Sequence, residues 1–400
     1  MYLLTVDNCL LRIDRYDDLT PSRDPGFSAM LTAEVLVVGA GLAGLRVATE
    51  LGRRGHDVVL VDRRPRPGCA IRTTGILVRK TLDDYPLPED CLGPGIRTVV
   101  LYPPSLRAPV TLTSDRVEYR VADMARLYEA AVDEARAAGV RIHFGTRYRG
   151  RDGKRLLLDT SRGTTVLRAT YLVGADGARS RVARDLGLDR NSRLLVGAEE
   201  TFGIEGGDGP PTFHCVIDPR VAPGYLAWTV NDGRHAHVGV AGHPDRFAKG
   251  LKRAVREFRA TAPGLAGTVR TTEPELRGGP IPVGGVLRRI GSPAGLLVGD
   301  AAGAVSPLTA GGLDPCLRLS DHAAQVLHEA LVTGRPSALR DYRGDGLRAQ
   351  FRGRLLLRTG LEQVRSAPVA TAAFAALRTR AGRRAARAVL FRDRSFPDPA

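Results

Sequence analysis

The sequence predicts an α/β fold in which a three-layer part built from βαβ units is interleaved with a mixed or antiparallel β-sheet and followed by helices. Three observations predict this fold. A strand, a glycine-rich turn, a helix and a second strand follow one another over residues 34–62. Residues 192–277 hold short alternating strands separated by turn residues. Glycine-and-acid motifs follow apolar strands again near residues 174 and 299, so the chain returns to the first part.

The first element is a βαβ unit of the Rossmann type. Residues 34–38 form a short apolar strand, and residues 42–54 have helical periodicity. Residues 58–61 form a second strand, which ends at Asp62. The motif GAGLAG lies between the first strand and the helix. A strand, this motif, a helix and an acid about twenty residues further on together predict a dinucleotide-binding site.

Each glycine of this motif has its own task. Gly39 permits the tight turn, Gly41 lets the backbone approach a pyrophosphate, and Gly44 lets the helix pack on the strand. The start of the helix directs unpaired N–H groups at the phosphates. Asp62 is placed to accept hydrogen bonds from a ribose. The predicted cofactor contacts of this unit are Gly39, Gly41, Leu42, Ala43, Gly44, Asp62 and Arg63.

Two later motifs favour a flavin over a nicotinamide cofactor. The sequence GADG occupies residues 174–177, and GDAAG occupies residues 299–303. In the later motif a strand runs into a turn that carries one carboxylate, Asp300, followed by small residues and Pro307. Such a turn suits a hydroxylated chain and the close approach of a flat ring. A nicotinamide enzyme has no evident need of it.

In order and spacing the three motifs resemble the flavoprotein superfamily of p-hydroxybenzoate hydroxylase and the geranylgeranyl reductases, over about residues 33–331. The resemblance implies bound FAD. It places Asp300 on the ribityl chain, Pro307 against the isoalloxazine ring, and a helix start at Gly311 facing that ring. The cofactor contacts that it adds are Asp176, Gly177, Gly299, Asp300, Pro307, Gly311 and Gly312.

The second part of the chain is more similar to the reductases than to the hydroxylases. Residues 222–228, 238–240 and 278–282 look like the corresponding stretches of geranylgeranyl reductase-type enzymes. Aromatic hydroxylases usually have a histidine where this chain has Gly303. Flavin halogenases have a tryptophan pair, whereas this chain has a single tryptophan. The substrate contacts that the resemblance implies are Tyr225, Leu226 and Trp228.

The implied reaction is hydride transfer from reduced flavin to an alkene of an apolar, isoprenoid-like substrate. The alternative is a FAD-dependent monooxygenase that hydroxylates or epoxidises an aromatic or secondary-metabolite substrate. No second GxGxxG motif is present for a nicotinamide cofactor. We therefore expect the flavin to be reduced by NAD(P)H that binds transiently or by an external electron carrier.

The sequence assigns no catalytic residue. The candidate proton donors are Asp314, Tyr225, His214 and His237, and an isolated histidine is more often an ordinary surface or core residue. His235 and His237 share a strand face but lack a third ligand. We therefore predict no metal site.

The alternation between nucleotide-binding and substrate segments predicts the domain organisation. The FAD-binding domain is expected at residues 31–75, 120–190 and 278–330, the substrate domain at 76–119 and 191–277, C-terminal helices at 331–400, and a disordered extension or start-site artefact at 1–30.

The net charge of +16 does not indicate a nucleic-acid partner. Nearly all of the charge is arginine, spread along the chain without a zinc-finger, helix-turn-helix or RNP pattern. We expect an apolar small molecule as the substrate instead. One basic amphipathic stretch, residues 374–394, suits peripheral contact with a membrane. The alternative, which we favour, is a terminal helix packed on the domain by its apolar side.

Several features bear on localisation. The five cysteines lack CxxC spacing and indicate neither a zinc site nor a disulfide framework. Residues 1–30 lack the pattern of a signal peptide. No run reaches the roughly eighteen apolar residues that a membrane span needs. We therefore expect a cytoplasmic protein, with any membrane association limited to peripheral contact.

Overall fold

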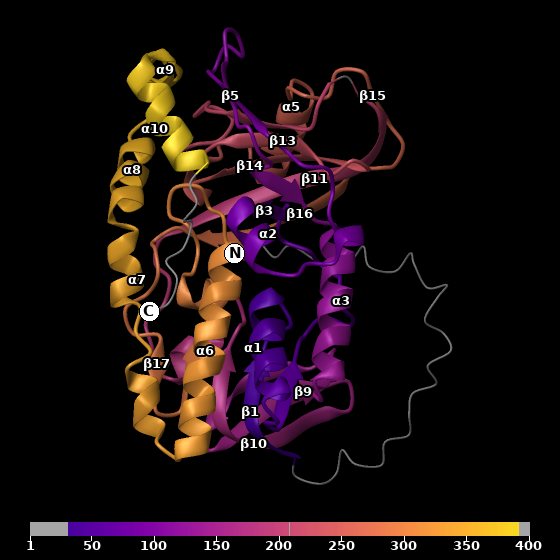
Figure 1. Ribbon diagram of the computed structural model, residues 1–400, viewed down its shortest axis with the longest axis vertical. Coiled ribbons are helices and arrows are strands. Elements are labelled where there is room, and N and C mark those ends of the chain that lie inside the picture. The colour runs from indigo at the N-terminus through magenta and orange to yellow at the C-terminus, as the bar shows by residue number, and fades with distance from the viewer. Residues whose placement is uncertain (1–30, 208, 392–400) are drawn as a thin grey trace.

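The computed structural model describes residues 31–207 and 209–391. Figure 1 shows two regions, one sheet with long helices in the lower half of the view and a second sheet above it. The extension expected at residues 1–30, and the last arginines of the basic stretch, Arg392 and Arg394, lie outside the described residues.

The first sheet has a parallel centre, as βαβ units require. Strand β1 pairs in parallel with β2 and β10, and β10 pairs in parallel with β18. The carboxyl ends of three strands therefore meet at one edge, where Val38, Gly174 and Leu297 lie in register. The strands, in spatial order, are β17 (Gly291–Ser292), β18 (Gly295–Leu297), β10 (Gly163–Gly174), β1 (Leu31–Val38), β2 (Val58–Val61) and β7 (Arg141–His143), with β9 (Arg155–Thr160) and β8 (Arg147–Asp152) added from β10.

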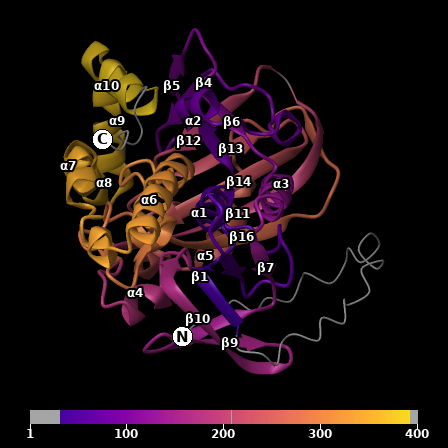
Figure 2. The same ribbon diagram turned by 60° about the horizontal axis from the view of Figure 1, so that its bottom comes forward.

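Three helices, α1 (Leu42–Arg53), α3 (Met124–Ala137) and α6 (Leu313–Thr333), lie side by side next to this sheet (Figures 1 and 2). Helix α1 begins at the residue that the sequence predicts. Asp123 caps α3, because its carboxylate accepts hydrogen bonds from the N–H groups of Ala125 at 3.1 Å and Arg126 at 3.3 Å. Such a cap satisfies donors that the start of a helix leaves unpaired.

The second sheet is mixed, since β12 pairs in parallel with β4 and the other pairs are antiparallel. Together the two sheets and their helices confirm the predicted α/β fold class. The strands, in spatial order, are β15 (Thr268–Arg270), β11 (Leu194–Gly206), β14 (His235–Gly242), β13 (Ala227–Asn231), β12 (Thr212–Val216), β4 (Thr98–Tyr102) and β5 (Val110–Thr113), with β16 (Glu275–Pro282) also paired to β11.

The two faces of the second sheet have different neighbours. Helix α5 (Leu251–Arg259) packs Val255 and Phe258 against one face. On the other face, the hydroxyl of Thr74 donates a 2.6 Å hydrogen bond to Glu199 of β11. Thr74 belongs to the segment that leaves the first sheet after β2. We call this side of the second sheet the inner face, because it borders the nucleotide-binding part.

One strand boundary differs from the expectation. The sequence predicts a strand over residues 225–230, but β13 begins at Ala227. Gly224 has a φ of +77°, and the N–H of Tyr225 donates to the carbonyl of Ala222 at 3.1 Å, so a turn precedes the strand. Further short elements are β3 (Ile76–Val78), which pairs with β6 (Tyr119–Val121), and the helices α2 (Arg79–Asp84) and α4 (Arg181–Asp185).

The C-terminal helices are α7 (Asp345–Gln350), α8 (Arg352–Glu362), α9 (Ala367–Arg378) and α10 (Arg380–Leu390), and they lie along one side of both regions (Figure 1). The basic stretch, expected as one helix, is therefore split between α9 and α10. Thr379 accounts for the break: its side chain accepts a hydrogen bond from the N–H of Gly382 at 3.0 Å and so caps α10.

The apolar side of the basic stretch packs on the second sheet. Phe374 is 2% exposed and belongs to a cluster with Ile96 and Val99. The hydroxyl of Tyr119 donates to the carbonyl of Leu390. This arrangement matches the alternative of a terminal helix packed by its apolar side. Insertion of Phe374 into a membrane would first require this cluster to unpack.

None of the helices within residues 31–207 and 209–391 combines the length and the apolar composition needed to cross a membrane.

Candidate functional site

The three glycine-and-acid motifs meet at the carboxyl edge of the first sheet. Gly39 has a φ of +110°, and a Cβ there would lie 2.7 Å from the carbonyl carbon of Ala175 in the second motif. A Cβ on Gly44 would collide with the carbonyl oxygen of Gly39. A Cβ on Gly299, in the third motif, would lie 2.7 Å from the Cβ of Ala43. The structure therefore brings together motifs that are far apart in the sequence.

Gly41 differs from the other two glycines of the motif because no atom beyond its adjacent residues lies within 4 Å of the position that its Cβ would occupy. It is the N-cap of α1 and has a φ of −74°, which any residue adopts. The first helical residues, Leu42 and Ala43, bury their side chains. The open space at Gly41 and the free N–H groups of the first turn fit a pyrophosphate.

Asp62 lies at the end of β2 and accepts a 2.7 Å hydrogen bond from the N–H of Ala40 in the glycine turn. It also pairs with Arg64, whose guanidinium lies 2.8 Å away. Burial raises the pKa of Asp62, but the hydrogen bonds and charge of Arg64 outweigh this effect and lower it. The sequence named the exposed Arg63 and missed Arg64.

Asp176 of the second motif has a structural task. Its carboxylate accepts hydrogen bonds from the hydroxyl of Ser180 at 2.6 Å and from the N–H groups of Arg181 at 2.7 Å and Val182 at 3.2 Å. It therefore holds the start of α4. Gly177 has a φ of +85°, with open space at its Cβ position. The cofactor contacts expected of Asp176 and Gly177 stay predictions.

Asp300 of the third motif has no hydrogen-bond partner on its carboxylate within the described part of the chain. Burial raises its pKa to about 6, and the nearby charge of Arg72 partly opposes this rise. Its carbonyl accepts a 2.8 Å hydrogen bond from the side chain of Asn191, which also donates to the carbonyl of Ala178 at 3.1 Å. Asn191 thus ties the second motif to the third, a contact that the sequence did not predict.

The turn after the third motif closes toward α6. The N–H of Ser306 donates to the carbonyl of Gly311 at 3.0 Å, and Pro307 within the turn is buried. Gly312 is the N-cap of α6, and a Cβ there would lie 3.7 Å from a carboxylate oxygen of Asp300. The sequence-predicted acid and the predicted helix start therefore lie next to each other.

The three predicted substrate residues join one apolar cluster. Tyr225, Leu226 and Trp228 pack there together with Ala310, which precedes Gly311, and with Leu361 of α8. The indole of Trp228 lies across the backbone of the opposite strand, where Gly239 leaves room for it. The cluster thus places apolar side chains beside the turn of the third motif.

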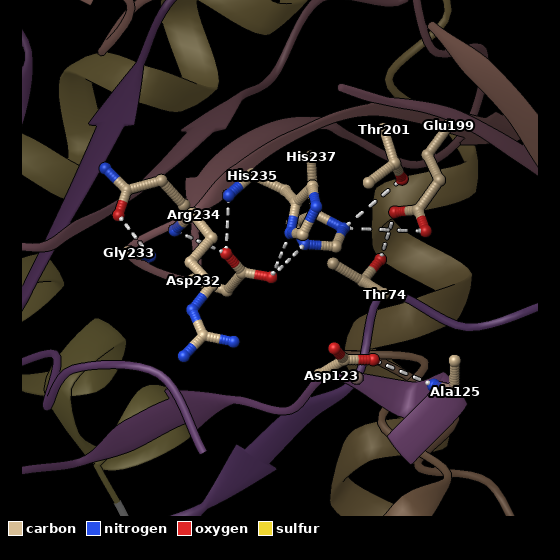
Figure 3. Close-up of polar contacts among 12 residues, drawn as sticks. Thr74, Asp123, Ala125, Glu199, Thr201, Asp232, Gly233, Arg234, His235 and His237 are labelled. Carbon is tan, nitrogen blue, oxygen red and sulfur yellow. Dashed lines mark hydrogen bonds and ion pairs between the residues drawn. The ribbon is translucent and has the colours of Figure 1, made fainter. Parts of the chain in front are cut away.

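A buried charged network lies on the inner face (Figure 3). His237 is 3% exposed and has carboxylates on both sides. Its Nε2 lies 3.3 Å from Asp232, and its Nδ1 lies 3.8 Å from Glu199. Burial lowers the pKa of His237, but these carboxylates outweigh it and raise the pKa to about 9. The imidazole is therefore charged at neutral pH.

The sequence named His237 as a candidate but missed its partners Glu199 and Asp232. The available signal was the adjacent pair Glu199 and Glu200 in the middle of strand β11, because an acid is rarely buried without a partner. Two other candidates are engaged elsewhere. Asp314 accepts a 2.9 Å hydrogen bond from Thr81 and pairs with Arg318. His214 bonds to the hydroxyl of Tyr102 at 3.0 Å, and burial lowers its pKa.

Comparisons with known proteins agree with this geometry. A family model described as FAD binding domain matches residues 32–351. Digeranylgeranylglycerophospholipid reductase 1 of Methanothermobacter thermautotrophicus is 31% identical, over 77% of this chain and 80% of its own. A solved geranylgeranyl bacteriochlorophyll reductase-like protein from Thermoplasma acidophilum has a TM-score of 0.75 and 21% identity, covering 86% of this chain and 90% of its own.

A second solved structure, p-nitrophenol 4-monooxygenase from Pseudomonas putida, has a TM-score of 0.62 and 21% identity. The match covers 92% of this chain and 95% of that protein. At this level of identity both solved structures show the shared fold and nothing about the reaction.

Proposed function

The chain belongs to the FAD binding domain family, and on that premise we propose that it reduces an alkene of an apolar, isoprenoid-like substrate with electrons from bound FAD. It is an oxidoreductase, and its relative from Methanothermobacter thermautotrophicus is named a reductase rather than a monooxygenase. The observation that carries the proposal is the convergence of the three motifs beside the apolar cluster around Trp228.

We propose that the predicted residues of the three motifs hold the cofactor. The open position at Gly41 would receive the pyrophosphate, and Asp300 would accept hydrogen bonds from the ribityl hydroxyls. The arginines near Asp62, including Arg64 and Arg72, add positive charge where a dinucleotide would need it. Bound FAD would supply hydride and electron transfer, which side chains alone cannot perform.

The chain's own task is to place the substrate and exclude water. Tyr225 and Trp228 offer apolar surface beside Ala310 and the start of α6. These apolar side chains suit an apolar substrate. For reduction of the flavin we propose a transient visit of NAD(P)H or an external electron carrier, because the sequence has no second GxGxxG motif.

A monooxygenase is the second candidate, because the fold, which p-nitrophenol 4-monooxygenase shares, does not by itself distinguish the two reactions. The two candidates differ in the product. A digeranylgeranylglycerophospholipid, incubated without oxygen with protein reduced by dithionite, should gain two hydrogens for each alkene reduced. Mass spectrometry of the lipid checks this result. A product that gains oxygen in air, with no hydrogenated product in either condition, would establish the monooxygenase instead.

We also propose peripheral membrane contact through exposed residues of the C-terminal helices. Leu356 of α8 and Val369 of α9 are 74% and 48% exposed, and Arg380 and Arg384 of α10 are exposed too. Each arginine near an anionic surface contributes about 1 kcal/mol. Replacing both arginines with glutamine should weaken co-sedimentation with phosphatidylserine vesicles, whereas neutral vesicles should retain little of either protein. Equal sedimentation of both proteins with anionic vesicles would remove this proposal.

A further inference from the structure

The C-terminal end of α8 holds several basic side chains around one carboxylate, that of Glu362. Arg358 donates from its Nε to this carboxylate at 3.0 Å, and Arg193 donates to both of its oxygens at 3.1 and 2.9 Å. Arg246 donates to the backbone carbonyl of Glu362 at 3.5 Å, and the Nε2 of His243 lies 3.8 Å from the carboxylate. We call these five residues the α8 basic cluster.

The α8 basic cluster has an excess of positive charge. Its three arginines are always protonated, and Glu362 is its one carboxylate, so the guanidinium groups exceed the carboxylate by two charges. Burial and the charge of Arg246 lower the pKa of His243, and its ring is therefore neutral at pH 7.

Arg358 is the buried member of the cluster. Its side chain is fully buried, and neither Nη1 nor Nη2 has a hydrogen-bond partner among residues 31–207 and 209–391. The ring of Tyr225 covers the guanidinium, with its centroid 5.4 Å from Cζ. A ring in that position leaves the N–H groups unpaired, because all five of them lie in the plane of the guanidinium.

Capping of the helix does not account for Arg358. Basic side chains near a helix C-terminus commonly bond to its last carbonyl groups. Arg246 does so through the carbonyl of Glu362, but the terminal nitrogens of Arg358 reach no such group. Buried charges are ordinarily paired and fully hydrogen-bonded. The terminal nitrogens of Arg358 therefore suit an anion that the chain itself does not supply.

The α8 basic cluster adjoins the apolar cluster around Trp228. Tyr225 stacks on Arg358 and also belongs to the apolar cluster, as does Leu361, the residue before Glu362. The apolar cluster further includes Ala310 of the turn that follows the third motif. Apolar side chains thus connect the proposed flavin contacts with the charged end of α8.

We propose that Arg193, Arg246 and Arg358 bind a phosphate group at the end of an isoprenoid chain. This inference rests on the proposed function, because the isoprenoid chain is the part of the ligand that is reduced. A phosphate monoester carries a charge of about −1.5 to −2 at pH 7, which matches the two excess positive charges. Guanidinium groups also form paired hydrogen bonds with phosphate oxygens.

Glu362 competes with this anion. Its carboxylate lies between Arg193 and Arg358, in the position that a phosphate bound to both would take. Glu362 is the last residue of α8, and its side chain is 15% exposed, so the carboxylate can turn toward solvent when phosphate replaces it. Arg358 and Glu362 both follow residue 351, where the match to the family model ends.

The test uses the full-length, FAD-loaded protein and isothermal titration calorimetry. The probes are farnesyl phosphate, farnesol, which has the same chain without phosphate, and inorganic phosphate. We expect farnesyl phosphate to bind at least about tenfold more tightly than farnesol, in line with hydrogen bonds to charged groups. Inorganic phosphate lacks the chain and should bind more weakly than farnesyl phosphate. Because Trp228 is the single tryptophan of the chain, a change in its fluorescence on binding locates the ligand at the apolar cluster.

The variants should shift the affinity for farnesyl phosphate in opposite directions. Arg358→Met keeps the apolar length of the side chain and should weaken binding at least about tenfold, and Arg193→Gln should weaken it at least about threefold. Glu362→Gln removes the competing charge and should strengthen binding at least about threefold. The matched control is Arg190→Gln, an equal loss of charge at an exposed arginine outside the cluster, and it should leave binding unchanged. The affinity for farnesol should be the same in all four variants.

If Arg358→Met does not fold, Arg193→Gln and Glu362→Gln decide. Equal binding of farnesol and farnesyl phosphate, or unchanged binding in both of these variants, would overturn the phosphate site and leave the proposed function intact. Inorganic phosphate that binds as tightly as farnesyl phosphate would overturn it too, since the site would then take free phosphate. If neither isoprenoid bound to the FAD-loaded wild-type protein, the apolar substrate of the proposed function would also be wrong.

Discussion

Replacing Gly41 with valine should give a folded protein that no longer retains FAD. The backbone at Gly41 is extended and no atom beyond the adjacent residues lies within 4 Å of its Cβ position, so the Cβ of a valine has room there. The same side chain would fill the space where the pyrophosphate approaches the start of α1. We expect FAD affinity to fall by at least about a hundredfold, which corresponds to a loss of about 2.7 kcal/mol of binding free energy.

The matched comparison is Gly44→Val, which lies three residues away in the same motif. A side chain at Gly44 would collide with the carbonyl oxygen of Gly39, so this variant should lose stability as well as cofactor. Thermal unfolding by circular dichroism and chromatography of the released flavin separate the two effects. A Gly41→Val protein that is yellow and releases FAD would show that the pyrophosphate lies elsewhere.

Removing the carboxylate of Asp300 should weaken FAD binding by about tenfold to a hundredfold, because hydrogen bonds to charged groups contribute roughly 1.5–3 kcal/mol. Titration of the apoprotein with FAD, followed by quenching of flavin fluorescence, measures the change in Asp300→Ala. Unchanged affinity would refute the contact with the ribityl chain.

The same residue predicts how binding depends on pH. Burial raises the pKa of Asp300 to about 6, so the carboxyl becomes protonated as the pH falls through this value. In the proposed contact the ribityl hydroxyls would donate to the ionised form, and FAD affinity should therefore be constant above about pH 7 and weaken below pH 6. Asp300→Asn has no such titration and serves as the control. A wild-type affinity that is equal at pH 5 and pH 8 would contradict this prediction.

The features that the sequence predicted well depend on residues close together in the chain. The glycine turn, the first turn of α1 and the acid at Asp62 form one continuous βαβ unit, and local spacing is enough to identify them. The parallel sheet then places Gly174 and Leu297 beside Val38. Because motifs that follow parallel strands meet at one edge, their convergence was also foreseeable.

The features that it missed depend on pairing between distant strands. Nothing near Glu199 in the sequence indicates that Thr74 and His237 will be its neighbours, since strand order and register decide these contacts. The break between α9 and α10 has a different cause. The arginine-rich periodicity continues through Thr379, and only the capping hydrogen bond to Gly382 shows that a new helix begins there.

The cluster in which Phe374 packs with Ile96 and Val99 can be completed only late in the synthesis of the chain. A ribosome makes β4 first, and roughly 270 residues follow before α9 exists. At about 5–20 residues per second, the interval is on the order of ten seconds to a minute. During this interval the apolar side chains of the second sheet that pack against Phe374 lack this contact. A bound chaperone would protect this surface until the last helices have been made, so the yield of protein in a cell should depend on the C-terminal segment more than its distance from the cofactor site suggests.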